Sequence, residues 1–200
     1  MFIKKYLIQS QKILESIDTQ SLESMIRILK EVKERGGRVF FLGSGGGAGH
    51  ASHAVCDFRK LGGFQAYCPS DNVSELTARI NDEGWDVSMA NYLLASQLNS
   101  KDCLFIFSVG GGSEEPPISM NLVLAMKTAK KAGSNIVGIV GKDGGATAIY
   151  ADACMIIPTI DSQLITPHTE GMQAVLWHLL VSHPDLRAHS TKWESLDLAE

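Results

Sequence analysis

The sequence predicts an α/β protein, an αβα sandwich in which a doubly wound parallel sheet lies between two layers of helices. Short continuous apolar runs alternate with longer amphipathic segments, a pattern typical of strands buried on both faces and of the helices that cover them. Two of the apolar runs enter glycine-rich turns, at residues 43–49 and 108–113. Such turns lie at the carboxyl edge of a parallel sheet, where this class of fold binds its ligands.

The first half of the chain begins with about 36 residues in which apolar side chains recur at helical spacing, and we interpret them as an N-terminal helical arm. Residues 38–42 form the first expected strand, and a helix is expected over 48–60 after the first glycine turn. A short strand should follow over 64–68. Residues 73–99 predict one or two helices, interrupted near Asn81-Asp82-Glu83-Gly84.

The second half continues the alternation. Strands are expected over 103–107, 135–140 and 153–157, with a helix over 121–132 and a turn without catalytic duty at Gly141-Lys142-Asp143-Gly144-Gly145. The last helix runs from Thr166, as N-cap, with Pro167 at the first helical position, to about Ser182. The predicted organisation is an arm at 1–36, a ligand-binding domain at 37–185 and a tail at 186–200 without a clear pattern.

Length and composition indicate one core of ordinary size, because the chain has 200 residues of which 44% are hydrophobic. A net charge of −4 without a basic block argues against nucleic-acid binding. No apolar run approaches the length of a membrane span and the first residues do not resemble a secretory signal, so we expect a cytoplasmic protein. The four cysteines form no C-x-x-C pair, which predicts reduced, mostly buried thiols.

The two glycine turns are the strongest functional signal. Glycine lets backbone N–H groups approach an anion closely, and a helix that follows adds a favourable dipole. Two such turns in one small chain therefore indicate a phosphorylated ligand. The pattern Gly43-x-Gly45-x-x-Ala48 also fits a dinucleotide site, with Asp71 as the ribose ligand, but the second turn disfavours that alternative. A kinase is disfavoured because the turns lack a Gly-Lys-Ser/Thr ending.

Together these motifs resemble the sugar isomerase (SIS) domain family and, within it, the phosphoheptose isomerases. The resemblance covers most of the chain and rests on the arm, the last helix and these segments: Phe41-Leu42-Gly43-Ser44-Gly45-Gly46, Asn81-Asp82, residues 108–113, Gly141-Lys142-Asp143-Gly144-Gly145 and Ala151-Asp152. It implies a flavodoxin-like sandwich and a homotetramer with active sites between subunits. It also implies interconversion of sedoheptulose 7-phosphate and glycero-manno-heptose 7-phosphate, a step of heptose and lipopolysaccharide biosynthesis.

The resemblance further implies a zinc site, with ligands from a H-x-x-x-E helix and from a Q-x₇-H helix. The corresponding positions are His53, Asp57, Glu170 and His178, so Asp replaces Glu and Glu replaces Gln. This donor set suits zinc, manganese or iron. Catalysis is assigned to Asp57 and His178. Substrate and phosphate contacts are assigned to residues of both turns and to two acidic side chains: Ser44, Gly45, Gly46, Gly47, Ser108, Gly110, Gly111, Ser113, Asp82 and Glu170.

Elementary chemistry and helix geometry bear on these assignments. Moving a proton between C1 and C2 of a sugar requires a base and a group that polarises the carbonyl, which a carboxylate and a metal ion or an imidazole can supply. His53 and Asp57 are four residues apart and share one helix face. Glu170 and His178 lie about 12 Å apart along a regular helix. One metal ion can therefore bind both side chains only if they come from two subunits or if the helix is distorted.

Simpler interpretations stay open for the same residues. His53 and Asp57 can be a surface pair, Glu170 a partner of the helix dipole, and His178 a core histidine beside Trp177. Ser113 can cap a helix that contains Pro116 and Pro117, and Asp82 can be a turn residue. Solvated or capping roles are expected for the remaining histidines, which are His50, His168, His183 and His189. The chain can also be a non-catalytic SIS-domain tetramer that binds a sugar phosphate or a protein partner.

Overall fold

The computed structural model describes residues 1–190, in which five parallel strands form one sheet in the order β2-β1-β3-β4-β5. The strands are β1 (Arg38–Gly43), β2 (Gln65–Tyr67), β3 (Cys103–Ser108), β4 (Asn135–Val140) and β5 (Ala153–Ile156). The strand order reverses between β1 and β3. Both glycine turns leave the sheet at this switch point, where sheets of this kind bind ligands. The predicted doubly wound parallel sheet is confirmed.

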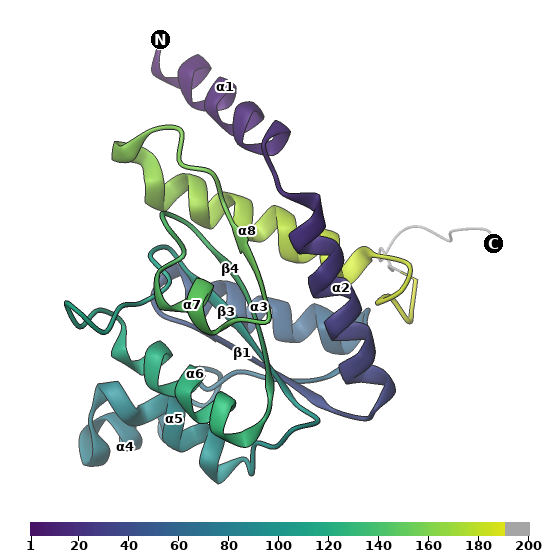
Figure 1. Ribbon diagram of the computed structural model, residues 1–200, viewed down its shortest axis with the longest axis vertical. Coiled ribbons are helices and arrows are strands. Elements are labelled where there is room, and N and C mark those ends of the chain that lie inside the picture. Colours follow the sequence, from purple (N-terminus) through teal and green to yellow (C-terminus); the bar gives the residue numbers. More distant parts are fainter. Residues whose placement is uncertain (191–200) are drawn as a thin grey trace.

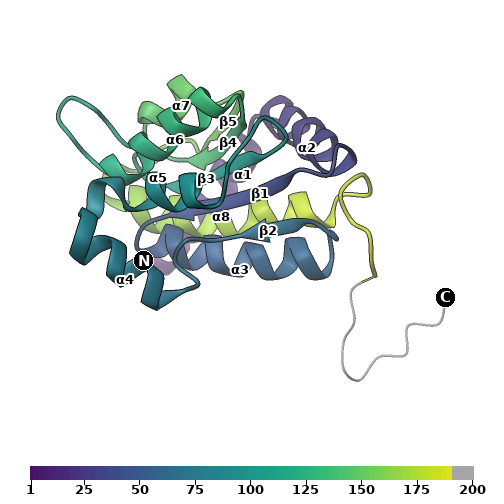
Figure 2. The same ribbon diagram turned by 90° about the horizontal axis from the view of Figure 1, so that it is seen from below.

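Helices cover both faces of the sheet (Figure 2). One layer consists of α2 (Thr19–Glu34), α3 (Gly46–Lys60) and α8 (Ile165–Ser182), and the other of α5 (Trp85–Ala95), α6 (Met120–Ala132) and the short α7 (Gly145–Tyr150). The strands alternate between them, because Phe41 packs with the first layer and Phe40 with the second. An additional helix, α4 (Val73–Glu83), packs on α5.

The first helix, α1 (Phe2–Glu15), extends past the edge of the sandwich (Figure 1). Its exposed side includes large apolar residues, namely Phe2, Ile3, Leu7, Ile8 and Leu14. Asp18 then caps α2 by accepting a hydrogen bond from the Gln20 N–H. In residues 1–190, no helix combines the length and the apolar character that a membrane span requires.

Two local predictions were wrong, and one helix was missed. Helix α8 begins at Ile165 without a side-chain cap, because the 3₁₀ turn at 162–164, capped by Asp161, leads directly into it. Ser113 does not cap a helix: it pairs with Ile118 across a small hairpin that contains both prolines. Helix α7 was not predicted, since its hydrogen bonds to the second glycine turn are tertiary contacts. The predicted tail falls beyond the described residues from position 191 onward.

Candidate functional site

Helices α3 and α8 bring three of the four predicted metal ligands together. The Oδ2 atom of Asp57 lies 3.9 Å from Nε2 of His53 and 3.8 Å from Nε2 of His178. All three donor atoms lie within 4.8 Å of one another. The imidazoles are half-exposed, whereas the Asp57 carboxylate is mostly covered, at 18% exposure. Two helices that are far apart in the sequence therefore contribute one cluster of nitrogen and oxygen donors.

The orientation of the His178 ring suits metal binding. Its Nδ1 lies 2.7 Å from the carbonyl oxygen of Ala174, one helical turn earlier. A carbonyl only accepts, so Nδ1 carries the proton and the lone pair of the neutral ring is on Nε2, the atom that faces Asp57. The ring also stacks on Trp177, with centroids 3.5 Å apart. Both contacts hold the ring in the tautomer and orientation of a metal ligand.

The separations in the cluster fit a zinc ion after a small adjustment. Ligand atoms around a tetrahedral zinc lie about 3.4 Å apart, because the bonds are about 2.0–2.2 Å long. The two Asp57 separations exceed this value by about half an ångström, and the donor atoms of the two imidazoles lie within 4.8 Å of each other, so side-chain rotation has to bring all three donors closer. Two imidazoles and one carboxylate leave a fourth position open, as in catalytic zinc sites.

Glu170 does not join this cluster. Its carboxylate lies at the start of α3, where a Cβ added to Gly46 would approach the carboxyl carbon to 2.4 Å. Gln173, one turn further along α8, holds this helix against the sheet because its Nε2 donates to the carbonyls of Ser108 and Ile139 near the ends of β3 and β4. Burial lowers the pKa of the neighbouring His50, and Glu170 partly offsets this effect.

The first glycine turn lies against the start of α6. The hydroxyl of Ser44 accepts a hydrogen bond from Nδ2 of Asn121, a fully buried side chain whose Oδ1 has no partner within residues 1–190. Gly45 adopts a positive φ of 57°, which favours glycine. Gly47 packs so closely that a Cβ there would lie 2.6 Å from the carbonyl oxygen of Phe107. Any side chain at position 47, including one that bears a hydroxyl, would therefore displace the end of β3.

The second glycine turn is held in shape by its own polar groups. Ser108 ends β3, and its hydroxyl accepts a hydrogen bond from the N–H of Gly111. Gly111 has a φ of 74° and touches the carbonyl of Gly144, where a Cβ would lie 1.9 Å from the oxygen. A Cβ added to Gly110 would meet no atom within 4 Å, and the residue is intermediate in burial.

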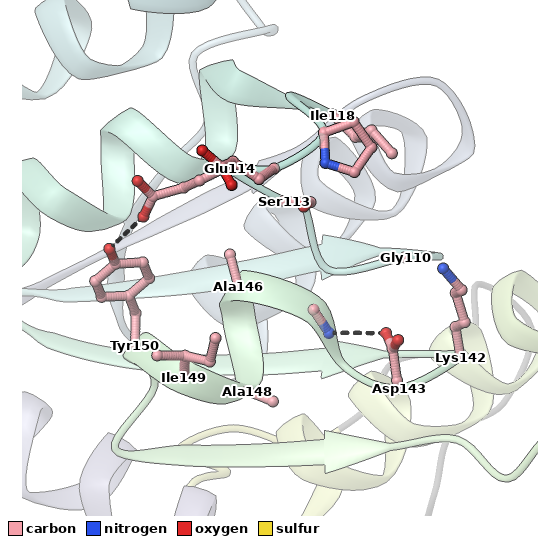
Figure 3. A pocket seen from close by; sticks show the side chains of 14 residues that line it. Gly110, Ser113, Glu114, Ile118, Lys142, Asp143, Ala146, Ala148, Ile149 and Tyr150 are labelled. Atoms are coloured by element: carbon pink, nitrogen blue, oxygen red, sulfur yellow. Dashed lines mark hydrogen bonds between the residues drawn. The ribbon is translucent and has the colours of Figure 1, made fainter.

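A hollow of about 860 Å³ lies between this turn, the 113–118 hairpin and α7. Figure 3 shows the residues that line it, with the Tyr150 hydroxyl donating to Glu114 and the Gly145 N–H donating to Asp143. Ser113 lines the hollow as part of the hairpin and not as a helix cap. The hollow is on the α6 and α7 side of the sheet, whereas the metal-ligand cluster is on the α3 and α8 side.

The structure also shows the surroundings of several other residues considered in the sequence analysis. Asp82 is in the last turn of α4, and the only hydrogen bond of its side chain in the described part of the chain comes from Asn81. His168 is not solvated: it is 4% exposed and stacks on Tyr6 of α1. The cysteines are free, as expected; Cys68 and Cys103 are buried, Cys154 is intermediate and Cys56 is exposed. Burial raises the pKa of Cys154 to about 11 and raises that of Cys68, which keeps both thiols protonated.

Sequence reasoning missed two residues at this edge. Asn121 binds Ser44, and Ser119 precedes α6 with a left-handed φ of 50°, so Ser119 and not Ser113 is at the helix start. A polar residue inside an otherwise apolar helix pattern was the available signal for Asn121.

A family model described as SIS domain matches residues 5–141. The lincomycin biosynthesis protein LmbN of Streptomyces lincolnensis is 30% identical over 188 residues, 90% of this chain and 68% of that protein. The phosphoheptose isomerase of Helicobacter pylori strain P12 is 27% identical, covering 88% of this chain and 90% of that enzyme. The structure of a phosphoheptose isomerase from Neisseria gonorrhoeae has the same fold, with a TM-score of 0.78 at 20% identity over 90% of this chain and 95% of that one.

Proposed function

Because this chain belongs to the SIS domain family, we propose that it is a sugar-phosphate isomerase that holds a divalent metal ion between α3 and α8. The observation that carries the proposal is the meeting of His53, Asp57 and His178. Zinc is the first metal to test. The relatives named phosphoheptose isomerases make sedoheptulose 7-phosphate the first substrate to test, in a heptose-forming step.

The metal ion, Asp57 and His178 have different roles in this proposal. A bound divalent ion would polarise the carbonyl of the open-chain sugar. Asp57 turns Oδ2 toward both imidazoles, and its Oδ1 has no hydrogen bond to any residue in 1–190. That oxygen is free to carry the proton between C1 and C2. His178, fixed by Ala174, keeps its Nε2 lone pair directed at the cluster.

The phosphate group belongs at the glycine turns. Backbone N–H groups of the glycine turns, such as that of Gly110, are donors that suit a phosphate oxygen. Ser44 and Ser108 place hydroxyls at the ends of β1 and β3, on either side of the switch point. The sugar would thus extend from the carboxyl edge of the sheet toward a metal ion.

We infer that the complete site is shared between subunits of a homotetramer. The cluster lies on the half-exposed outer side of α3 and α8, while Glu170 faces the first glycine turn about 12 Å earlier along α8. A second chain that packs on this side could supply its own Glu170 as the fourth ligand. The exposed apolar residues of α1 provide further surface for such packing.

Metal content and turnover test the proposal together. Elemental analysis of the purified protein should find stoichiometric zinc, manganese or iron, and His53→Ala should lose it, while the exposed control His189→Ala keeps it. Five- to seven-carbon ketose phosphates are then assayed with and without added metal. Equal metal content in His53→Ala and the parent would remove the site, and absence of turnover with every substrate would remove the activity.

A non-catalytic sugar-phosphate binder is the second candidate. The shorter side chain of Asp57 favours it, because a base one methylene further from the sugar transfers a proton poorly. A tetramer that contains the metal, binds sugar phosphates and shows no turnover would select this alternative.

A further inference from the structure

Trp177 lies against both histidines of the His53, Asp57 and His178 cluster. Its ring centroid is 3.5 Å from that of His178, on which it stacks, and 4.8 Å from that of His53, which it meets edge to face. The two imidazoles are themselves 5.4 Å apart and nearly perpendicular, with an interplanar angle of 88°. One side chain of α8 therefore contacts the nitrogen ligands of both helices.

The indole is fixed in the core, whereas the imidazoles are not. Trp177 is 1% exposed and belongs to the apolar core beneath α2, α3 and α8. The side chains of His53 and His178 are 60% and 48% exposed. His178 is held by its bond to Ala174, but within residues 1–190 the His53 ring makes no hydrogen bond, and an exposed ring of this kind samples several rotamers. Contact with the buried indole therefore limits the orientations of the His53 ring.

Packing alone does not account for a tryptophan at this position. The indole Nε1 is buried and has no hydrogen-bond partner within residues 1–190. A buried N–H group without a partner destabilises the folded state, and a buried tryptophan usually has one. Leucine, methionine or phenylalanine would fill apolar space here without an unpaired donor. The unpaired donor indicates that the aromatic ring serves the groups it contacts.

The face of the indole also suits an imidazole that binds a metal ion. A metal ion withdraws electron density from the ring that binds it, so the bound ring carries part of the positive charge. The face of tryptophan attracts positive charge more strongly than that of phenylalanine or tyrosine. His178 stacks on Trp177 with an interplanar angle of 26°. The contact should therefore strengthen when Nε2 of His178 binds a metal ion.

We propose that Trp177 is a positioning residue for the metal centre, and that its indole holds both imidazoles with their Nε2 atoms toward Oδ2 of Asp57, at 3.8 and 3.9 Å. Trp177 itself contacts neither the metal ion nor the sugar. The inference rests on the metal-binding half of the proposed function and is independent of the substrate.

Substitutions at Trp177 test this role through metal affinity, measured by competition with a chelator. Trp177→Met fills the core with a flexible side chain that has no ring. It should lower the affinity for zinc about 10- to 100-fold, the usual effect of losing a group that orients a metal ligand. Trp177→Phe restores an aromatic ring and should recover most of the loss. In the cobalt(II) forms, the visible absorption typical of tetrahedral coordination should weaken in Trp177→Met and persist in Trp177→Phe.

Two controls separate positioning from a general loss of stability. Leu29→Ala opens a cavity in the same core from α2, so it should destabilise the fold and leave the zinc affinity unchanged. Trp85→Met replaces an exposed tryptophan at the start of α5 and should change neither property.

The outcomes also separate this inference from the proposed function. If the parent protein binds zinc but isomerises no sugar phosphate, the activity fails, and a lower affinity in Trp177→Met still supports the role of Trp177. Equal zinc affinity in the parent and Trp177→Met overturns the inference and leaves the metal site in place. An affinity that falls as far in Leu29→Ala as in Trp177→Met also overturns it. A parent that binds none of zinc, manganese and cobalt removes both the metal site and the role of Trp177.

Discussion

At the scale of single residues, one backbone carbonyl determines the chemistry of the candidate centre. The hydrogen bond from Nδ1 of His178 to Ala174 fixes the ring tautomer, and without it the ring nitrogen that faces Asp57 could carry the proton. The bond is internal to α8, so it forms with the helix and requires no partner chain. His178, the member of the cluster on α8, therefore has the tautomer of a metal ligand before any metal binds.

Asp57 is the residue whose replacement tests the chemistry most directly. Asp57→Asn should reduce incorporation of solvent deuterium at C1 or C2 of the sugar phosphate by about 100-fold or more, since the amide is not a base. Asp57→Glu should raise turnover if the shorter chain limits the rate. The metal content of both variants is measured alongside, so that loss of metal is not mistaken for loss of the base. Undiminished exchange in Asp57→Asn contradicts the assignment.

A substitution at Gly46 tests whether the position of the Glu170 carboxylate matters for activity. Gly46→Ala places a methyl group 2.4 Å from the Glu170 carboxyl carbon, and the carboxylate must move. We expect kcat/KM to fall about 10- to 100-fold, the cost of a misplacement near 1 Å. Gly49→Ala in the same helix meets no atom within 4 Å and should be neutral.

Part of this residue-level picture follows from sequence alone. The spacing of His53 and Asp57 predicts a shared helix face, and the eight-residue interval places Glu170 away from His178 along the helix. The meeting of Asp57 with His178 does not follow, because it requires α3 and α8 to lie side by side over the sheet. Asn121 and the burial of His168 were missed for the same reason: their partners are distant in the sequence.

At the scale of elements, α1 is attached to the body through a small polar network. Lys5 and Gln9 both donate to Oδ2 of Asp161, and Gln9 also contacts Nε2 of the buried His168. The ion pair with Lys5 is the largest of the contacts that hold the pKa of Asp161 at about 2, below its usual 3.8. The charged carboxylate thus favours the docked arm at every pH above 3.8, and this contribution is lost as the pH falls through 2.

Removal of the charge on either side should loosen the arm without unfolding the sandwich. Lys5→Gln and Asp161→Asn should each speed amide hydrogen exchange within α1 by a few-fold, because the pair is partly exposed and contributes modestly. Exchange in the central strands should stay as in the parent. Lys4→Gln on the same helix is the control. If Lys4→Gln and Lys5→Gln speed exchange equally, the network does not hold the arm.

The elements themselves were predictable where their pattern is local. Strands buried on both faces read as continuous apolar runs, and all five were expected within a residue of their observed ends. Helix α7 and the 113–118 hairpin have no such signal. Helix α7 depends on hydrogen bonds to the second glycine turn, which only the folded sheet creates, whereas the hairpin is closed locally by the pairing of Ser113 with Ile118.

At the scale of the whole molecule, the candidate site has two parts that lie apart: the glycine turns and the metal-ligand cluster. The glycine turns are at the carboxyl edge between β1 and β3, and α3 and α8 both start at this edge and run back along the sheet. Seven residues separate Gly46 from His53, so the cluster lies about 10 Å from the first turn of α3. A ligand that must contact both parts has to span this distance or meet a second subunit.

Mixed oligomers distinguish these possibilities. Glu170→Ala and His178→Ala chains are each expected to be inactive alone. If Glu170 of one chain completes the cluster of another, co-assembled chains contain interfaces with one intact residue from each parent, and partial activity should return. Recovery is limited to the fraction of interfaces that pair the two variants in this way, and chains mixed without subunit exchange should stay inactive. Verified mixed oligomers with no activity above either parent, beside an active wild-type protein, would mean that a single chain carries its site alone.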